Sequence, residues 1–111
     1  MITDPRSAFL EAATWHGPLE PAEEILSAHP EIASADIHTA AVRGDDAAVR
    51  RFLELDPASA TATSDPYGAD ALVYLCLSKY LRLDRARTPA FLRAARALLD
   101  AGADPNTGFW T

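Results

Sequence analysis

The sequence predicts an all-α protein built of stacked antiparallel helix pairs with short turn connections. Three observations support this prediction. Apolar residues recur at helical spacing along most of the chain, and Gly and Pro interrupt them at turns. The order of helix, turn and helix also repeats, which favours a layered arrangement over a closed bundle.

Length and composition fit one domain over residues 1–111. With 49% hydrophobic and 23% charged residues, the chain has the balance of a globular protein rather than a disordered one. No apolar run approaches the roughly 18 residues of a membrane span, and the first residues lack the pattern of a secretory signal. We therefore expect no membrane association and a cytoplasmic location. Cys76 is the single cysteine, which excludes an intrachain disulfide.

Charge is unevenly distributed. Residues 1–70 contain thirteen acids and four bases, a net charge of -9, whereas residues 71–111 contain three acids and six bases, a net charge of +3; together they give the total of -6. A negative surface does not attract nucleic acid, so nucleic-acid binding is not expected. The bases of the second part lie within residues 79–96.

The first helix pair is predicted near the N-terminus. Asp4 suits an N-cap and Pro5 the first helical position. The stretch from Trp15 to Pro18 ends the first helix. The second helix starts at about Glu20 and stops at His29-Pro30.

The second pair follows after a short connection. A brief helix starts at Ile37 and ends at Gly44, a residue suited to a left-handed C-cap. Asp45 or Asp46 then caps the next helix, and Asp56-Pro57 ends it.

The third pair is predicted to be longer. Residues 58–65 lack helical periodicity, and Asp65-Pro66-Tyr67-Gly68 is a turn sequence. A long helix then starts near Asp70, with two apolar stripes: Leu72, Leu75, Cys76, Tyr80 and Leu83, and Val73, Leu77 and Leu81. Thr88-Pro89 begins the last helix, with Thr88 as N-cap, and Gly102 closes it.

An internal repeat connects the first two pairs. Their matching positions are separated by 28 residues for the first match and 27 for the others. The matches are Ala12-Ala13 with Ala40-Ala41, Gly17 with Gly44, Ile25-Leu26 with Phe52-Leu53, and His29-Pro30 with Asp56-Pro57.

The stretch 97–106, Ala-Leu-Leu-Asp-Ala-Gly-Ala-Asp-Pro-Asn, resembles the end of the second helix of an ankyrin repeat. Ile37-His38-Thr39-Ala40 is similar to the Leu-His-x-Ala part of the same family's first helix. The resemblance implies an ankyrin-like α-solenoid with units at about 4–33, 34–67 and 68–106, and with 107–111 starting a further, incomplete unit. Leu72 to Leu99 spans 27 positions against 16 for Ile37 to Leu53, so the third unit contains eleven extra residues.

The same resemblance implies a non-catalytic module that binds another protein through its concave face and turn tips. Tryptophan, tyrosine and arginine contribute much of the energy at such interfaces. The positions expected at this surface are Trp15, Val42, Arg43, Asp65, Pro66, Tyr67, Leu77, Ser78 and Trp110.

An alternative function is an inhibitory or regulatory protein that masks an enzyme or toxin through the basic segment 79–96. Its bases are Lys79, Arg82, Arg85, Arg87, Arg93 and Arg96.

The third unit also lacks an obvious polar cap. Self-association through this unit is a further expectation.

The residues that could suggest catalysis or metal binding have simpler, structural explanations. His16, His29 and His38 fall in different predicted elements and match no metal motif, and His38 is expected to hydrogen-bond a neighbouring turn. Capping and the helix dipole explain Asp45-Asp46 and Glu23-Glu24. Cys76 is expected in the core, and a small helical enzyme that uses its thiol is a further alternative. We therefore expect no cofactor, no metal and no enzymatic activity.

Overall fold

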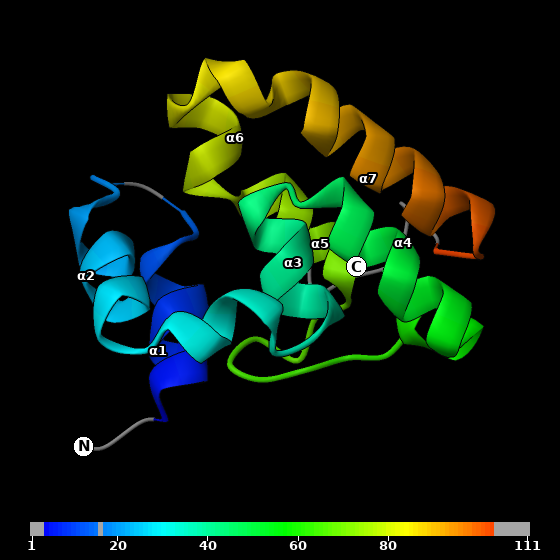
Figure 1. The fold of residues 1–111 in the computed structure, drawn as a ribbon, viewed down its shortest axis with the longest axis horizontal. Helices are drawn as coiled ribbons and strands as arrows, with labels where there is room; N and C mark the ends of the chain where they lie inside the picture. The colour runs from blue at the N-terminus through cyan, green and yellow to red at the C-terminus, as the bar shows by residue number, and fades with distance from the viewer. Residues whose placement is uncertain (1–3, 16, 104–111) are drawn as a thin grey trace.

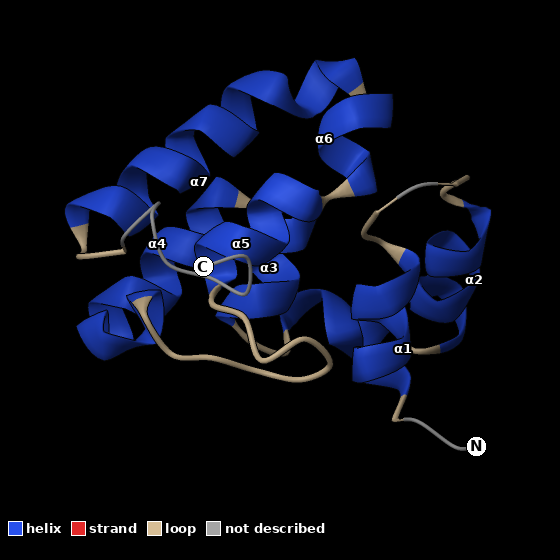
Figure 2. Cartoon of the chain, turned by 180° about the vertical axis from the view of Figure 1, so that it is seen from behind, coloured by secondary structure: helices blue, strands red, loops and turns tan. Residues whose placement is uncertain are grey.

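The computed structural model describes residues 4–15 and 17–103. The described residues form seven α-helices and three short 3-10 helices, and no β-strand occurs among them (Figures 1 and 2). The α-helices are α1 (Pro5–Ala12), α2 (Glu20–Ala28), α3 (Ile37–Arg43), α4 (Asp46–Leu55), α5 (Ala71–Leu77), α6 (Lys79–Leu83) and α7 (Thr88–Asp100). The 3-10 helices are η1 (Pro30–Ser34), η2 (Pro57–Ala60) and η3 (Arg85–Arg87). The prediction of an all-α protein is confirmed.

An aspartate caps the start of α1, α3 and α5 alike. The carboxylates of Asp4, Asp36 and Asp70 each accept a hydrogen bond from the backbone N–H three residues later. Asp36 also forms a capping box with Thr39. These caps stand 32 and 34 residues apart, so the chain restarts a helix at nearly constant intervals.

Glycine ends α3 and follows the end of α7 in the same way. Gly44 has a φ of 71° and Gly102 a φ of 112°. In both turns the glycine N–H donates to the carbonyl three residues back, and the next N–H donates to the carbonyl five residues back. This is the Schellman arrangement, and it confirms the two predicted helix ends.

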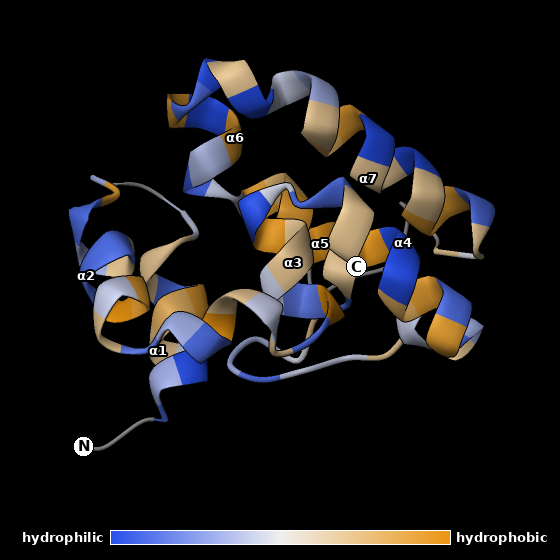
Figure 3. Ribbon diagram, in the orientation of Figure 1, coloured by the Kyte–Doolittle hydropathy of each residue, from blue (hydrophilic) through white to orange (hydrophobic). Residues whose placement is uncertain are grey.

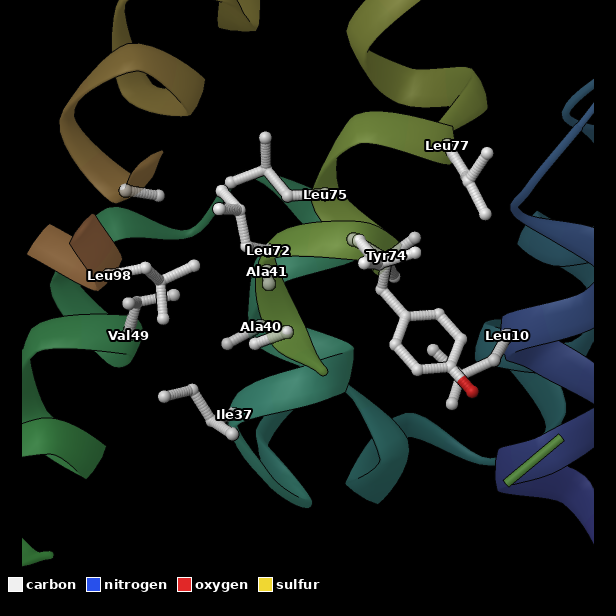
Figure 4. Close-up of a cluster of buried hydrophobic side chains, with 14 of the residues drawn as sticks. Leu10, Ile37, Ala40, Ala41, Val49, Leu72, Tyr74, Leu75, Leu77 and Leu98 are labelled. Atoms are coloured by element: carbon white, nitrogen blue, oxygen red, sulfur yellow. The ribbon is translucent and has the colours of Figure 1, made fainter. Parts of the chain in front are cut away.

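Helix pairs pack against one another across a shared interior. α1 packs on α2, α3 on α4 and α5 on α7, while α3 also lies along α5 and α4 along α7 (Figure 1). The buried apolar side chains form one cluster that reaches from α1 to α7, with residues of α3 and α5 at its centre (Figure 4). Hydrophobic colour accordingly concentrates on the inner parts of these helices, and α2 and α7 show hydrophilic segments (Figure 3).

The long first helix predicted for the third pair is wrong. The helix breaks at Ser78, whose ψ of 132° is extended, and α6 leaves in a new direction. The Ser78 hydroxyl accepts from the N–H of Tyr80 at 3.1 Å and donates to the carbonyl of Val42. The side chain thus caps α6 and ties the break to α3, which offsets the helical hydrogen bonds lost there.

The first pair is bonded directly to the third. The N–H of Trp15 donates to the carbonyl of Leu77 at 3.0 Å, and the N–H of Lys79 donates to the carbonyl of Ala13 at 2.7 Å. These two bonds bracket Ser78, so the loop after α1 forms a short bridge with the α5–α6 break. The first pair therefore contacts more than its neighbour in sequence.

Two smaller predictions also need correction. The sequence predicts Cys76 in the core, but this residue is exposed, because α5 packs on α3 and α7 through its other faces. Thr88 lies inside α7 and the residue at its N-cap position is Arg87. The cap at Asp45 and the helix end at Asp56 are as predicted.

A membrane-spanning helix is not found anywhere in the described part of the chain.

Candidate functional site

Four rings form a row from the surface into the core. Trp15 meets Tyr67 edge to face with centroids 6.1 Å apart, Tyr67 stacks on Tyr74 at 5.6 Å, and His38 meets Tyr74 edge to face at 5.7 Å. Trp15 is 41% exposed, whereas Tyr74 is fully buried. The row joins the loop after α1, the turn before α5, α5 itself and α3.

Hydrogen bonds fix the inner part of this row. The Tyr74 hydroxyl donates to the carbonyl of Ser64 at 2.7 Å and accepts from the N–H of Tyr67 at 3.1 Å. Burial raises the pKa of Tyr74 above its ordinary value, so its hydroxyl stays protonated and able to donate. The Thr14 hydroxyl donates to the carbonyl of Leu10 at 2.8 Å and lies 2.7 Å from the Tyr67 hydroxyl. Since the threonine proton is already committed, Tyr67 is the donor of this second bond.

Trp15 is held in an unusual backbone conformation. Its φ of 68° lies in the left-handed region, which costs a bulky residue about 1 kcal/mol or more. The hydrogen bond from its N–H to Leu77 holds this conformation. The result is a large amphipathic ring presented partly to solvent at the bridge between the first and third pairs.

The other residues predicted to bind a partner divide into two groups. Asp65 is exposed and Pro66 half-buried, on the turn that carries Tyr67. Val42, Leu77 and Ser78 are buried and cannot contact a partner directly in this structure, which corrects their expected exposure. Their burial follows from the α5–α6 break, where Ser78 packs on the end of α3. Trp110 lies outside the described residues.

Arg43 lies apart from the aromatic row. Its guanidinium Nη1 is 3.8 Å from the Asp45 carboxylate, and its buried Nε has no partner within hydrogen-bond distance. Its carbonyl accepts from the Arg87 guanidinium at 2.9 Å. This residue therefore belongs to the contact between α3 and η3.

The basic segment 79–96 is not one surface patch, which corrects the prediction. Lys79 is buried, and its ammonium donates to the carbonyl of Pro18 at 3.2 Å. Arg87 lies over the Tyr80 ring at 4.6 Å and donates to Asp84 at 2.9 Å. Four of the six bases are held by intramolecular partners in this way, since Arg93 also pairs with Asp46 and Arg82 donates to the carbonyl of Leu77 at 3.3 Å. The remaining bases, Arg85 and Arg96, are exposed.

Asp36 is a junction between the pairs. Its carboxylate accepts from the guanidinium of Arg6 and from the N–H of Thr39, and lies 3.7 Å from Nδ1 of His38. Burial alone would raise the pKa of this carboxyl, but the neighbouring His38 ring and the hydrogen bonds from Arg6 and Thr39 outweigh it and hold the pKa well below its ordinary value. Arg6 also donates to the Ser64 hydroxyl at 2.6 Å. The ionised carboxylate thus connects α1 with α3, and Arg6 extends this connection to the loop before α5.

His38 bonds a neighbouring loop and Asp45 caps α4, as the sequence predicts, whereas Glu23 also has a partner in α6. His38 Nε2 lies 2.8 Å from the carbonyl of Ala62, a bond to the following loop. His29 lies elsewhere, 3.6 Å from Glu31, and His16 is outside the described residues. Glu23 accepts from the Tyr80 hydroxyl. No group of three or more His, Cys, Asp or Glu side chains in the described part of the chain could hold a metal ion.

Sequence reasoning missed Tyr74 and Asp36. Tyr74 falls on neither apolar stripe of the predicted long helix, so periodicity gives it no role. Asp36 precedes Ile37 by one residue and Thr39 by three, a capping-box spacing that is present in the sequence. The nearly equal spacing of Asp4, Asp36 and Asp70 is a further signal of the repeat.

Comparison of the chain with models of protein families, with curated proteins and with solved structures finds no match. No family assignment follows. The geometry of the aromatic row and its surroundings is therefore the basis of the functional proposal.

Proposed function

We propose that this chain is a non-catalytic protein-interaction module of ankyrin-like helix pairs. Its partner docks on the surface formed by Trp15, Asp65, Pro66 and Tyr67, called here the Trp15 surface. The observation that carries the proposal is the partly exposed Trp15 ring, held at a positive φ and backed by Tyr67. A conformation that costs free energy and presents a large ring to solvent favours a role in binding.

The ankyrin-like part of the proposal rests on recurrence. Aspartate caps at positions 4, 36 and 70 agree with a period of about 33 residues. The neighbouring packing of α3 on α5 and α4 on α7 is the side-by-side packing that stacked helix pairs require. The α5–α6 break and the bonds between the first and third pairs are departures from a simple solenoid.

The Trp15 surface is suited to binding because little of it must reorganise. Tyr67 is stacked on Tyr74 and bonded to Thr14, so its ring position is set before a partner arrives. Asp65 and Pro66 border it on a turn anchored by Arg6, whose guanidinium lies 3.4 Å from the Asp65 carbonyl. A pre-ordered aromatic surface loses less conformational entropy on binding than a flexible one.

Masking of an enzyme or toxin through residues 79–96 has less support. Lys79, Arg87 and Arg93 already have intramolecular partners, so a partner would have to compete for them. Arg82 donates to the carbonyl of Leu77, so Arg85 and Arg96 are the remaining exposed bases that would carry this alternative.

The test replaces Trp15 by asparagine, which tolerates a positive φ. Immobilised wild type and the Trp15→Asn variant are exposed to lysate of the source cells, and bound proteins are quantified by mass spectrometry. We expect the variant to fold and to lose at least tenfold of the specifically bound partner. A contact aromatic at the centre of an interface contributes about 2 kcal/mol or more, which corresponds to such a loss.

The matched control is Leu55→Gln, which removes an exposed apolar side chain at the end of α4. It should retain the partner at the wild-type level. Equal retention by Trp15→Asn and wild type, or no protein retained by wild type above background, would contradict the proposal.

A further inference from the structure

The outward face of α7 carries apolar side chains in solvent. Leu92 is 65% exposed and Leu99 43% exposed, and the seven-residue interval places them on one side of the helix. Arg96 is exposed between them, while half-buried Ala95 leaves space for a close approach. Leu92, Ala95, Arg96 and Leu99 are called here the α7 face.

The first pair presents the opposite charge. Residues 4–34 contain six acids and one base, a net charge of -5, whereas the α7 face carries the exposed base Arg96. The outer side of α2 has a shallow groove lined by Glu20, Glu23, Glu24, Ser27 and Ala28. Its walls combine carboxylates with the aliphatic stems below them. This groove is called here the α2 flank.

The geometry points to a head-to-tail contact between two copies of this chain, with the α7 face of one copy on the α2 flank of the next. Leu92 and Leu99 would bury their side chains against Ala28 and the glutamate stems, and Arg96 would lie among the carboxylates of Glu20 and Glu24. Burial of exposed leucines and the pairing of opposite charges act in the same direction.

Repetition of this contact would link the copies into an open chain of molecules rather than a closed dimer. α2 lies at one end of the molecule and the C-terminal half of α7 at the other (Figures 1 and 2). The two surfaces differ, so the assembly retains one unused α2 flank at one end and one unused α7 face at the other. Such heterologous contacts form open assemblies unless a rotation closes them.

Charge favours this occupant over a symmetric pairing of two α7 faces. Arg96 lies between Leu92 and Leu99, so a symmetric contact would bring two arginines close together near its centre. Like charges at a desolvating contact oppose association. The acidic α2 flank supplies the complementary sign.

The test is sedimentation velocity of the full chain over a wide range of concentration. We expect the weight-average sedimentation coefficient to rise without a plateau at the dimer value, and to fall when salt is raised from about 50 mM to about 500 mM, which shortens the Debye length. A monomer at all concentrations would overturn the proposal. A plateau at a dimer would overturn the head-to-tail arrangement.

Two variants identify the surfaces. Leu92→Gln with Arg96→Gln removes the α7 face, and Glu20→Gln with Glu24→Gln removes the α2 flank. Each variant alone should be monomeric, because one half of every contact is missing. An equimolar mixture should form one-to-one heterodimers and nothing larger, since each partner supplies the surface that the other lacks.

The matched control is Leu55→Gln with Arg51→Gln, an exposed leucine and arginine four residues apart on α4. It should associate like wild type. The proposal would be overturned if the mixture formed no heterodimers. It would also be overturned if the variant with Glu20→Gln and Glu24→Gln associated in the absence of the other variant. Because the Trp15 surface is intact in all these variants, the result does not depend on the function proposed above.

Discussion

Gly44 shows how one residue can satisfy two separate requirements. Its φ of 71° turns the chain after α3, and a Cβ atom at this position would lie 2.4 Å from Cε2 of Phe91. The turn therefore needs a residue that accepts the left-handed region and also has no side chain. The first requirement could be predicted from the sequence, whereas the second depends on the approach of α7.

Gly44→Ala is expected to lower the free energy of unfolding by about 2–5 kcal/mol. About 1–2 kcal/mol comes from alanine in the left-handed region, and about 1–3 kcal/mol from overpacking against Phe91. Gly68→Ala is the control, because Gly68 has a similar φ of 66° and an added Cβ atom there would meet nothing within 4 Å. Urea unfolding of both variants measures the difference. Equal losses would mean that Phe91 does not constrain Gly44.

From the ionised state of Asp36 we predict that the free energy of unfolding decreases in acid. Its pKa is lower in the folded protein than the ordinary value of 3.8, so the unfolded chain binds the proton more tightly. The stabilisation is therefore complete above about pH 4 and decreases as the pH falls through the folded pKa. The contribution depends on the ionised carboxylate, its bond to Arg6 and its proximity to the His38 ring.

Asp36→Asn should lower the free energy of unfolding by about 2 kcal/mol at pH 6 and by much less at pH 2. Asparagine retains the cap at α3 but loses the charge. Chemical unfolding of wild type and variant from pH 6 to pH 2 measures this, with exposed Glu54→Gln as the control. A difference that does not depend on pH would show that the charge of Asp36 does not stabilise the fold.

At the scale of elements, the break between α5 and α6 separates what sequence could predict from what it could not. The periodicity from Leu72 to Leu83 favours one helix, because side-chain spacing reports only a helical face. At the break, the Ser78 hydroxyl donates to the carbonyl of Val42 and the Lys79 N–H donates to the carbonyl of Ala13. These bonds replace the helical hydrogen bonds that are lost there. Such long-range partners have no signal in the local sequence.

Ser78→Ala is expected to lower the free energy of unfolding by about 1–3 kcal/mol. The substitution removes the cap of α6 and leaves the carbonyl of Val42 without the bond from the hydroxyl, in a site with no exposure. Ser27→Ala, on the exposed side of α2, should change it by less than about 0.5 kcal/mol. Thermal unfolding followed by circular dichroism compares the two. Similar small changes would contradict the role given to Ser78.

At the scale of the whole molecule, local signals locate most of the helices and their ends, and the bonds between distant segments determine their arrangement. Asp4-Pro5, Gly44 and Asp56-Pro57 are places where a local rule is sufficient. The aromatic row requires four segments to converge, so the sequence indicates Trp15 and Tyr67 separately but neither their direct contact nor the stacking of Tyr67 on Tyr74. The basic segment 79–96 does not form one surface patch for a similar reason, because Lys79 and Arg93 have partners in distant parts of the chain.

The central claim is that the Trp15 surface is preformed, because the loop after α1 is bonded to the α5–α6 break. Hydrogen exchange of backbone amides under native conditions, measured by NMR, tests it most directly. We predict that the N–H groups of Trp15 and Lys79 exchange with the same opening free energy as the amides in the interior of α3. Exchange of these two amides at the rate of an unprotected loop, while α3 remains protected, would contradict the claim.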